Sequence, residues 1–173
     1  MTPQFLQQTI KQYALLNDWY LSVLDGISDD HGNKVINDLT NSLEWISGHL
    51  IAGRYRNILR MGQHLELYAH LDKFVNPGIP PPNAIAFSRQ IPYAHLSENR
   101  MQWTRYGETL LSALHSVTDD VLDKQLPFSI PIDGNTVADA LSFVALHESY
   151  HIGQMSLIRK SLGYGAMVLG RRK

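Results

Sequence analysis

Two histidines that are four residues apart, His147 and His151, are the side chains of this sequence best suited to chemistry. Positions i and i+4 of an α-helix lie on one face, about 6 Å apart, so two imidazoles placed there can bind one metal ion. Apolar residues at helical spacing run through the same segment and predict that both histidines point toward the core. These apolar residues are Val137, Leu141, Val144, Met155, Ile158 and Leu162.

Two interpretations of this inward pair stay open. A buried polar group without a partner costs about 1–3 kcal/mol, so both imidazoles require a partner. The partner is either a shared metal ion or a set of core polar groups that hydrogen-bond to the rings. Tyr150 and Gln154 belong to the same segment, and they either orient ligands or substrate or serve only in packing.

The letters from His147 to His151 also spell H-E-x-x-H, the signature of zincin proteases. Zincins take their third ligand from downstream of this motif, but no His, Asp or Glu follows His151 in this chain. A third ligand must therefore come from upstream, which argues against a protease. Glu148 lies about 100° around the helix from His147, so a contact with one of the metal ligands, a dimer contact or solvent exposure is favoured over a role as general base.

A third donor is available upstream at His49, in a segment predicted to be helical from Thr40 or Asn41 to Met61. His49 falls on the inward ridge of this helix. Three neutral imidazoles suit zinc, and also nickel, iron or cobalt. Three protein ligands leave a coordination position open, as in catalytic rather than structural sites. The candidate ligands of a divalent metal ion are therefore His49, His147 and His151.

The helix that carries His49 has two further features. Gly48 and its small neighbours either let another element approach closely or leave room for a ligand. Arg54, Arg56 and Arg60 crowd the same helix; most of them are expected in solvent, and one could pair with a substrate carboxylate. The other histidines show no spacing toward the pair, and we expect them at the surface. They are His31, His64, His70, His95 and His115.

Four segments show the apolar periodicity of long amphipathic helices, and they span about residues 3–24, 40–61, 97–117 and 136–162. Within the connection from 63 to 92, residues 64–71 allow a short helix, whereas the proline-rich run 76–83 excludes regular structure. This connection is either a crossover that covers the open end of the site or a surface linker. Residues 118–135 form either a small hairpin or an irregular loop.

This pattern predicts an all-α fold: a four-helix bundle with a long crossover connection between helices 2 and 3. No second hydrophobic core is evident, so we expect residues 1–173 to form one domain. Bundles commonly build metal sites from side chains on facing helices, which is the architecture that the three histidines need.

The composition of the 173 residues excludes several classes of function. Charged residues make up 18% and the net charge is −1, so nothing indicates binding to nucleic acid or to an anionic membrane. The chain has no cysteine, which excludes disulfides, thiolate metal ligands and a cysteine nucleophile. Neither a signal peptide nor a membrane-spanning apolar run is evident, and we expect a cytoplasmic protein.

The residues around the candidate ligands match those of a known family. His49 behind Trp45, together with the run H-x-x-x-H-x-G-Q from His147 to Gln154, resembles the DinB/YfiT-like superfamily of metalloenzymes. The resemblance covers nearly the whole chain. It implies a four-helix bundle, often dimeric, that binds one divalent metal ion through three histidines, which by position are His49, His147 and His151.

Characterised members of that family include thiol transferases, which join low-molecular-weight thiols such as bacillithiol or mycothiol to electrophiles, and a thiol-dependent isomerase. We therefore expect a metal-dependent transferase that acts on a small-molecule substrate through a metal-bound low-molecular-weight thiol, with zinc as the favoured metal. A metal-dependent hydrolase is the alternative. Two further hypotheses are a non-catalytic, metal-binding dimeric bundle and a metal-free bundle with a satisfied polar core. The sequence identifies neither the substrate nor a catalytic residue.

Overall fold

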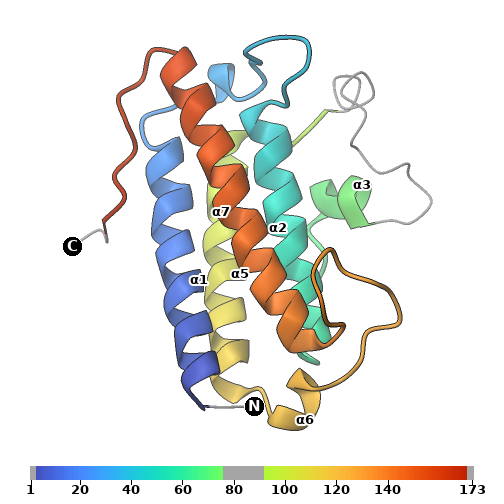
Figure 1. Ribbon diagram of the computed structural model, residues 1–173. Helices are drawn as coiled ribbons and strands as arrows, with labels where there is room; N and C mark the ends of the chain where they lie inside the picture. The colour runs from blue at the N-terminus through green and yellow to red at the C-terminus, as the bar shows by residue number, and fades with distance from the viewer. Residues whose placement is uncertain (1–2, 76–91, 171–173) are drawn as a thin grey trace.

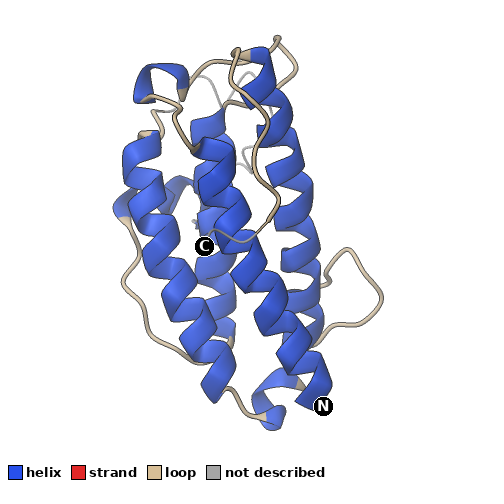
Figure 2. Ribbon diagram, turned by 90° about the vertical axis from the view of Figure 1, so that its left-hand side faces the viewer, coloured by secondary structure: helices blue, strands red, loops and turns tan. Residues whose placement is uncertain are grey.

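Four long helices lie side by side in the computed structural model of the chain, which describes residues 3–75 and 92–170 (Figure 1). The long helices are α1 (Pro3–Leu24), α2 (Leu43–Arg60), α5 (Leu96–Ser116) and α7 (Val137–Ser161). The short ones are η1 (Asp29–His31), η2 (Ala69–Leu71), α3 (Asp72–Val75) and α6 (Asp119–Leu122). The described residues contain no strand (Figure 2), which confirms the all-α prediction.

Each long helix packs mainly on two others, so that the order around the bundle is α1, α5, α2, α7. Helices α1 and α7 run upward in Figure 1, whereas α2 and α5 run downward. Because α2 and α5 are parallel neighbours, the chain between them must return over the length of the bundle. The predicted crossover between the second and third long helices is therefore confirmed.

The connections differ in detail from the expectation. The predicted short helix at 64–71 is wrong in its first half, since helical structure begins only at Ala69 in η2 and continues into α3. The proline-rich run 76–83 lies outside the described residues. Residues 118–135 contain the short helix α6 and then an irregular loop, whose ends are tied by one antiparallel bridge between Gln125 and Thr136.

Side-chain caps determine where the two site-bearing helices begin. Helix α2 is capped by Ser42, which accepts a 3.2 Å hydrogen bond from the Trp45 amide, and not by Thr40 or Asn41 as predicted. At the start of α7, Thr136 and Asp139 form a reciprocal capping box, with Asp139 Oδ2 accepting from the Thr136 amide at 2.9 Å. These caps satisfy backbone amides at the starts of α2 and α7, the helices that carry the three histidines.

Apolar and aromatic side chains make up most of the core. The rings of Tyr20 on α1 and Trp103 on α5 stack with centroids 3.9 Å apart, and both side chains are fully buried. In the described part of the chain, no helix is both long enough and apolar enough to cross a lipid bilayer.

Candidate metal centre

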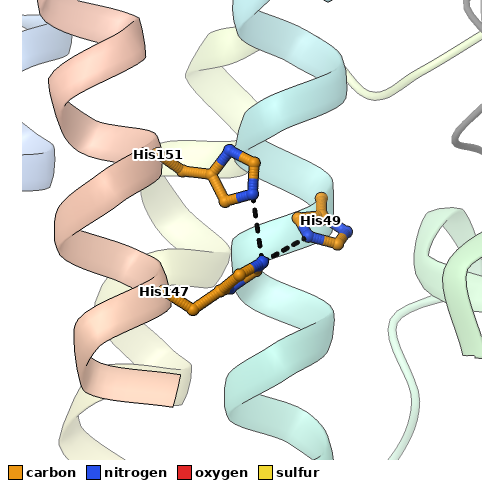
Figure 3. Close-up of side chains that lie close together, drawn as sticks. All are labelled: His49, His147 and His151. Atoms are coloured by element: carbon orange, nitrogen blue, oxygen red, sulfur yellow. Dashed lines mark hydrogen bonds between the residues drawn. The ribbon is translucent and has the colours of Figure 1, made fainter. Parts of the chain in front are cut away.

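The three histidines singled out from the sequence meet between α2 and α7. The Nε2 atom of His147 lies 3.1 Å from Nε2 of His49 and 3.0 Å from Nε2 of His151. Figure 3 shows the three rings turned toward one another, one from α2 and two from successive turns of α7. Among the described residues, this is the one group of His, Cys, Asp or Glu side chains whose donor atoms converge closely enough to hold a metal ion.

Hydrogen bonding alone does not satisfy this arrangement. A neutral imidazole nitrogen carries either one hydrogen or one lone pair, so Nε2 of His147 can serve only one of its two close neighbours. A cation placed among the three nitrogens accepts all three lone pairs at once. Ligand nitrogens on a tetrahedral zinc ion are about 3.3 Å apart, given bonds of about 2.0–2.1 Å, so the observed spacing suits a shared ion.

Burial keeps the three rings in the neutral form that metal ligation needs. Burial is the main cause that lowers the pKa of His49 to about 3, and the neighbouring His147, His151 and Arg56 contribute to this shift. Burial also lowers the pKa of His147 to about 4, again with help from His151 and Arg56. The pKa of His151 is lowered by burial and partly restored by its hydrogen bond to Gln154. No carboxylate contributes to any of these shifts.

These pKa shifts predict how the stability of the metal-free protein depends on pH. Between about pH 6.5 and about pH 4 the unfolded chain binds more protons on His49 and His147 than the folded chain does. Stability from these two groups is therefore fully present above pH 6.5 and is lost as the pH falls through this window. In urea titrations of the metal-free protein, the midpoint should decrease as the pH falls. This decrease should be smaller for the His49→Gln variant. A wild-type midpoint that stays constant across this window would contradict the prediction.

A hydrogen-bond chain behind His151 fixes its tautomer. Nδ1 of His151 lies 2.7 Å from Oε1 of Gln154, and because an amide oxygen only accepts, the ring proton must be on Nδ1. This leaves the lone pair of Nε2 free to face the other two rings. Gln154 Nε2 in turn donates to the hydroxyl of Tyr150 at 2.9 Å. The structure therefore favours the orienting role for Gln154 that the sequence had left open, whereas Tyr150 is 63% exposed.

Replacing Gln154 with leucine should weaken metal binding by about 10–100-fold without removing a ligand, because the proton of His151 could then move to Nε2. Competition with a chromophoric chelator measures this affinity. Ser156→Ala, in which another half-buried polar residue of α7 is changed, is the matched control. Equal affinities of the Gln154→Leu variant and the wild type would show that the hydrogen bond does not orient the ring.

Aromatic side chains enclose the cluster. The indole of Trp45 stacks on the His49 ring, with centroids 4.9 Å apart and an angle of 16° between the planes. The Phe143 ring lies 5.7 Å from that of His147. Phe74 of α3 packs over Gly48, where an added Cβ would come within 2.6 Å of the Phe74 ring. The small residue next to His49 therefore makes room for α3 and not for a ligand.

Glu148, the residue that a zincin would use as its base, points away from the three histidines. It is fully buried, and its carboxylate accepts two hydrogen bonds of 2.8 Å from the guanidinium of Arg54. Burial raises the pKa of the Glu148 carboxyl, and Arg54 opposes that rise. Arg54 also donates to Asn17 and lies over the Trp103 ring, 3.3 Å from its centroid. None of the roles expected for Glu148 is the one observed, because the carboxylate is neither exposed nor in contact with a candidate metal ligand but pairs with Arg54 inside the bundle.

The expectation that most of the three arginines of α2 lie in solvent is thus wrong, because Arg54 is completely buried, and Arg56 and Arg60 are half-buried. Sequence reasoning missed the Arg54–Glu148 pair. One signal was available, because a glutamate next to a core-facing histidine on a mostly apolar helix indicates a buried carboxylate that needs a cationic partner. The remaining histidines lie outside the cluster. His64, His70, His95 and His115 are exposed as expected, and the half-buried His31 lies 2.7 Å from the Tyr164 hydroxyl.

The fold and this cluster define a helical bundle with three histidines that converge from two facing helices. The chain belongs to the DinB superfamily, whose family model matches residues 12–155. A comparison with curated proteins gives no match.

Two solved structures resemble the chain over most of its length. YfiT from Bacillus subtilis, described as a probable metal-dependent hydrolase with an unusual four-helix bundle topology, superposes with a TM-score of 0.66 at 14% identity, covering 95% of this chain and 91% of YfiT. The DinB-like protein YjoA from Bacillus subtilis gives a TM-score of 0.57 at 16% identity, covering 98% of this chain and 99% of YjoA. At these identities, the likeness establishes the fold alone.

Proposed function

We propose that the protein is a metal-dependent enzyme whose divalent ion is held by His49, His147 and His151. The observation that carries this proposal is the convergence of three neutral imidazole nitrogens, which hydrogen bonds among themselves leave unsatisfied. Three protein ligands leave room for a substrate atom on the ion, as catalytic sites require. Membership of the DinB superfamily and the description of YfiT agree with a metal-dependent activity. Zinc is the favoured metal, and nickel, iron or cobalt are the alternatives.

The favoured reaction is the transfer of a low-molecular-weight thiol to an electrophile. All 16 acidic residues of the chain lie in its described part, yet no carboxylate joins the cluster or alters the pKa of its histidines. Activation of water commonly requires such a base to accept a proton, whereas a thiol has a pKa of about 8.5 and needs less assistance. When bound, a divalent ion supplies a Lewis acid that lowers the pKa of a thiol or a water molecule.

The protein's own residues then have definite tasks in this reaction. Gln154 holds the proton of His151 on Nδ1, and the rings of Trp45, Phe74 and Phe143 limit the access of water to the three histidines. The chain has no cysteine, so the sulfur must arrive with the substrate. One sulfur–carbon bond forms, the thiol proton passes to solvent, and the electrophile releases its leaving group.

A panel of thiols and electrophiles tests this proposal on protein reconstituted with each candidate metal. We expect metal-dependent conjugation of at least one small thiol to monochlorobimane, and no conjugation by metal-free protein that circular dichroism shows to be folded. Hydrolase activity toward ester or amide substrates, without thiol transfer, would instead favour the hydrolase suggested by the likeness to YfiT. If the protein unfolds when the metal is removed and shows neither activity, the ion is structural and the enzyme proposal fails.

A homodimer and a cytoplasmic location stay predictions. In support of the dimer, Leu146, Tyr150 and Leu157 form an apolar stripe on the outer face of α7, and they are 65%, 63% and 62% exposed. We expect light scattering to give a mass of twice 19.6 kDa for the wild type and a single 19.6 kDa for Leu146→Glu/Leu157→Glu. A wild type that stays monomeric at high concentration would contradict the dimer.

A further inference from the structure

Two arginines follow His49 along the same ridge of α2. His49, Arg56 and Arg60 are separated by seven and four residues, which places them on one face of the helix. The helical rise from His49 to Arg56 is about 10 Å. Both arginines are half-buried, and burial lowers the pKa of both guanidinium groups. Arg54 points instead into the bundle, where Glu148 neutralises it.

Neither Arg56 nor Arg60 has an anionic partner among the described residues, which include every Asp and Glu of the chain. Arg56 donates to the backbone carbonyl of Phe74, and Arg60 donates to Oδ1 of Asn57 at 2.7 Å. Arg60 also lies 5.2 Å from the centroid of the Phe128 ring. These contacts satisfy N–H groups but leave both positive charges uncompensated, and the charge of Arg56 further lowers the pKa of Arg60.

The uncompensated charges lie on the face of α2 that carries His49. Arg56 follows His49 by about two helical turns, and Arg60 follows it by about three. The two half-buried guanidinium groups repel each other, and they also repel a divalent cation held by the three histidines. Their surroundings screen these charges less than bulk water would. An anionic group lying between the cluster and the arginines removes this repulsion. The planar guanidinium fork matches the two oxygens of a carboxylate.

We propose that Arg56 and Arg60 form a subsite for a carboxylate group of the substrate, whose reacting end lies at the three-histidine cluster. This inference rests on the proposed function, and it specifies the substrate class as small molecules that carry a carboxylate several bonds away from the reacting atom. Arg56 makes the main contact, because it is the nearer of the two arginines to His49 along α2. Arg60 adds to the positive potential from one helical turn further along.

Binding of matched probes to the cobalt-substituted protein tests the subsite. The probes are ω-mercaptoalkanoates of increasing chain length, the mercaptoalcohols of equal length, and a parallel pair of alkyl hydroxamates with and without a terminal carboxylate. Cobalt absorption reports the head group, and calorimetry reports the dissociation constant. We expect the carboxylates to bind about tenfold tighter than the alcohols, with an optimum at one chain length. Arg56→Gln should abolish this preference, while the alcohols still bind and the protein still takes up one equivalent of cobalt.

Three controls make the outcome specific. Arg105→Gln removes an exposed arginine of α5 and should leave the preference intact. Arg60→Gln should reduce the preference partly, and Arg56→Lys should retain part of it. Equal dissociation constants for carboxylates and alcohols in the wild type, or a preference that survives in Arg56→Gln, would overturn the subsite.

Failure of the proposed function gives a different result. If no thiol changes the cobalt spectrum but hydroxamates do, the thiol chemistry is wrong, and the hydroxamate pair still decides whether the arginines select a carboxylate. If neither head group changes the spectrum, the ion has no position open to substrate, and the proposed function fails. In that case calorimetry still tests the anion site. Binding of the carboxylates by the wild type but not by Arg56→Gln would support the site, and no binding by the wild type would overturn it.

Discussion

Replacing His49 with alanine is expected to abolish the retention of metal by the purified protein. The variant removes one of the three nitrogens that converge within 4.8 Å of one another and leaves a pair on one helix. Changes to groups that merely orient a ligand weaken metal binding by about 10–100-fold, so loss of a ligand should exceed about 100-fold. Elemental analysis of untagged protein, purified without added metal, measures the effect directly.

Two further variants make the result specific to ligation. His115→Ala removes an exposed histidine of α5 and should leave the metal content unchanged. His49→Gln keeps a polar side chain of similar size against the Trp45 ring, and it should lose the metal while remaining folded by circular dichroism. If the His49→Ala protein retained one equivalent of metal, His49 would not be the third ligand.

Breaking the Arg54–Glu148 pair is expected to have the largest effect on stability. Both side chains are fully buried, so Glu148→Ala leaves the Arg54 guanidinium without its counter-ion in the core. Removal of one partner from a buried ion pair typically costs about 3–5 kcal/mol, a large share of the roughly 5–15 kcal/mol that stabilises a folded domain. Urea unfolding should therefore shift strongly, with the slope of the transition unchanged.

A double-mutant cycle separates loss of the pair from loss of packing. Arg54→Met and Glu148→Leu should each destabilise the protein, whereas the double variant should be more stable than either single one, because no isolated charge remains. The double variant should also retain its metal, since Glu148 faces away from the three histidines. Additive losses of stability would contradict the coupling. Loss of metal from a double variant that is still folded would show that Glu148 contributes to the site.

Much of the fold was predictable because helix periodicity is a local property. Helix α1 has the predicted bounds, Pro3–Leu24, and the other three long helices begin and end within a few residues of the predicted positions. The parallel pair formed by α2 and α5 was also predictable, because the long connection between them, residues 61–95, allows the chain to return. The capping residue of α2 was predicted wrongly, since Ser42, Asn41 and Thr40 all have suitable side chains and differ only in how the preceding loop places them.

The candidate site was predictable in part, for a similar reason. The spacing of His147 and His151 guarantees that they share a face of α7, whichever residues pack against them. His49 could be named because it falls on the inward ridge of another long helix. The role of Gly48 could not be predicted, because Phe74 packs on it from the short helix α3, whose position depends on a long connection.

The sequence by itself determined the four long amphipathic helices, the inward histidine pair and the absence of any thiol group in the chain. Only the tertiary structure decided which charges are neutralised. Glu148 pairs with Arg54 across 94 residues of sequence, whereas Arg56, two positions further along α2, donates to the Phe74 carbonyl and not to a carboxylate. The physical reason is that helical spacing fixes the angle between residues of one helix, while the partner of a charge depends on how separate helices are rotated against each other.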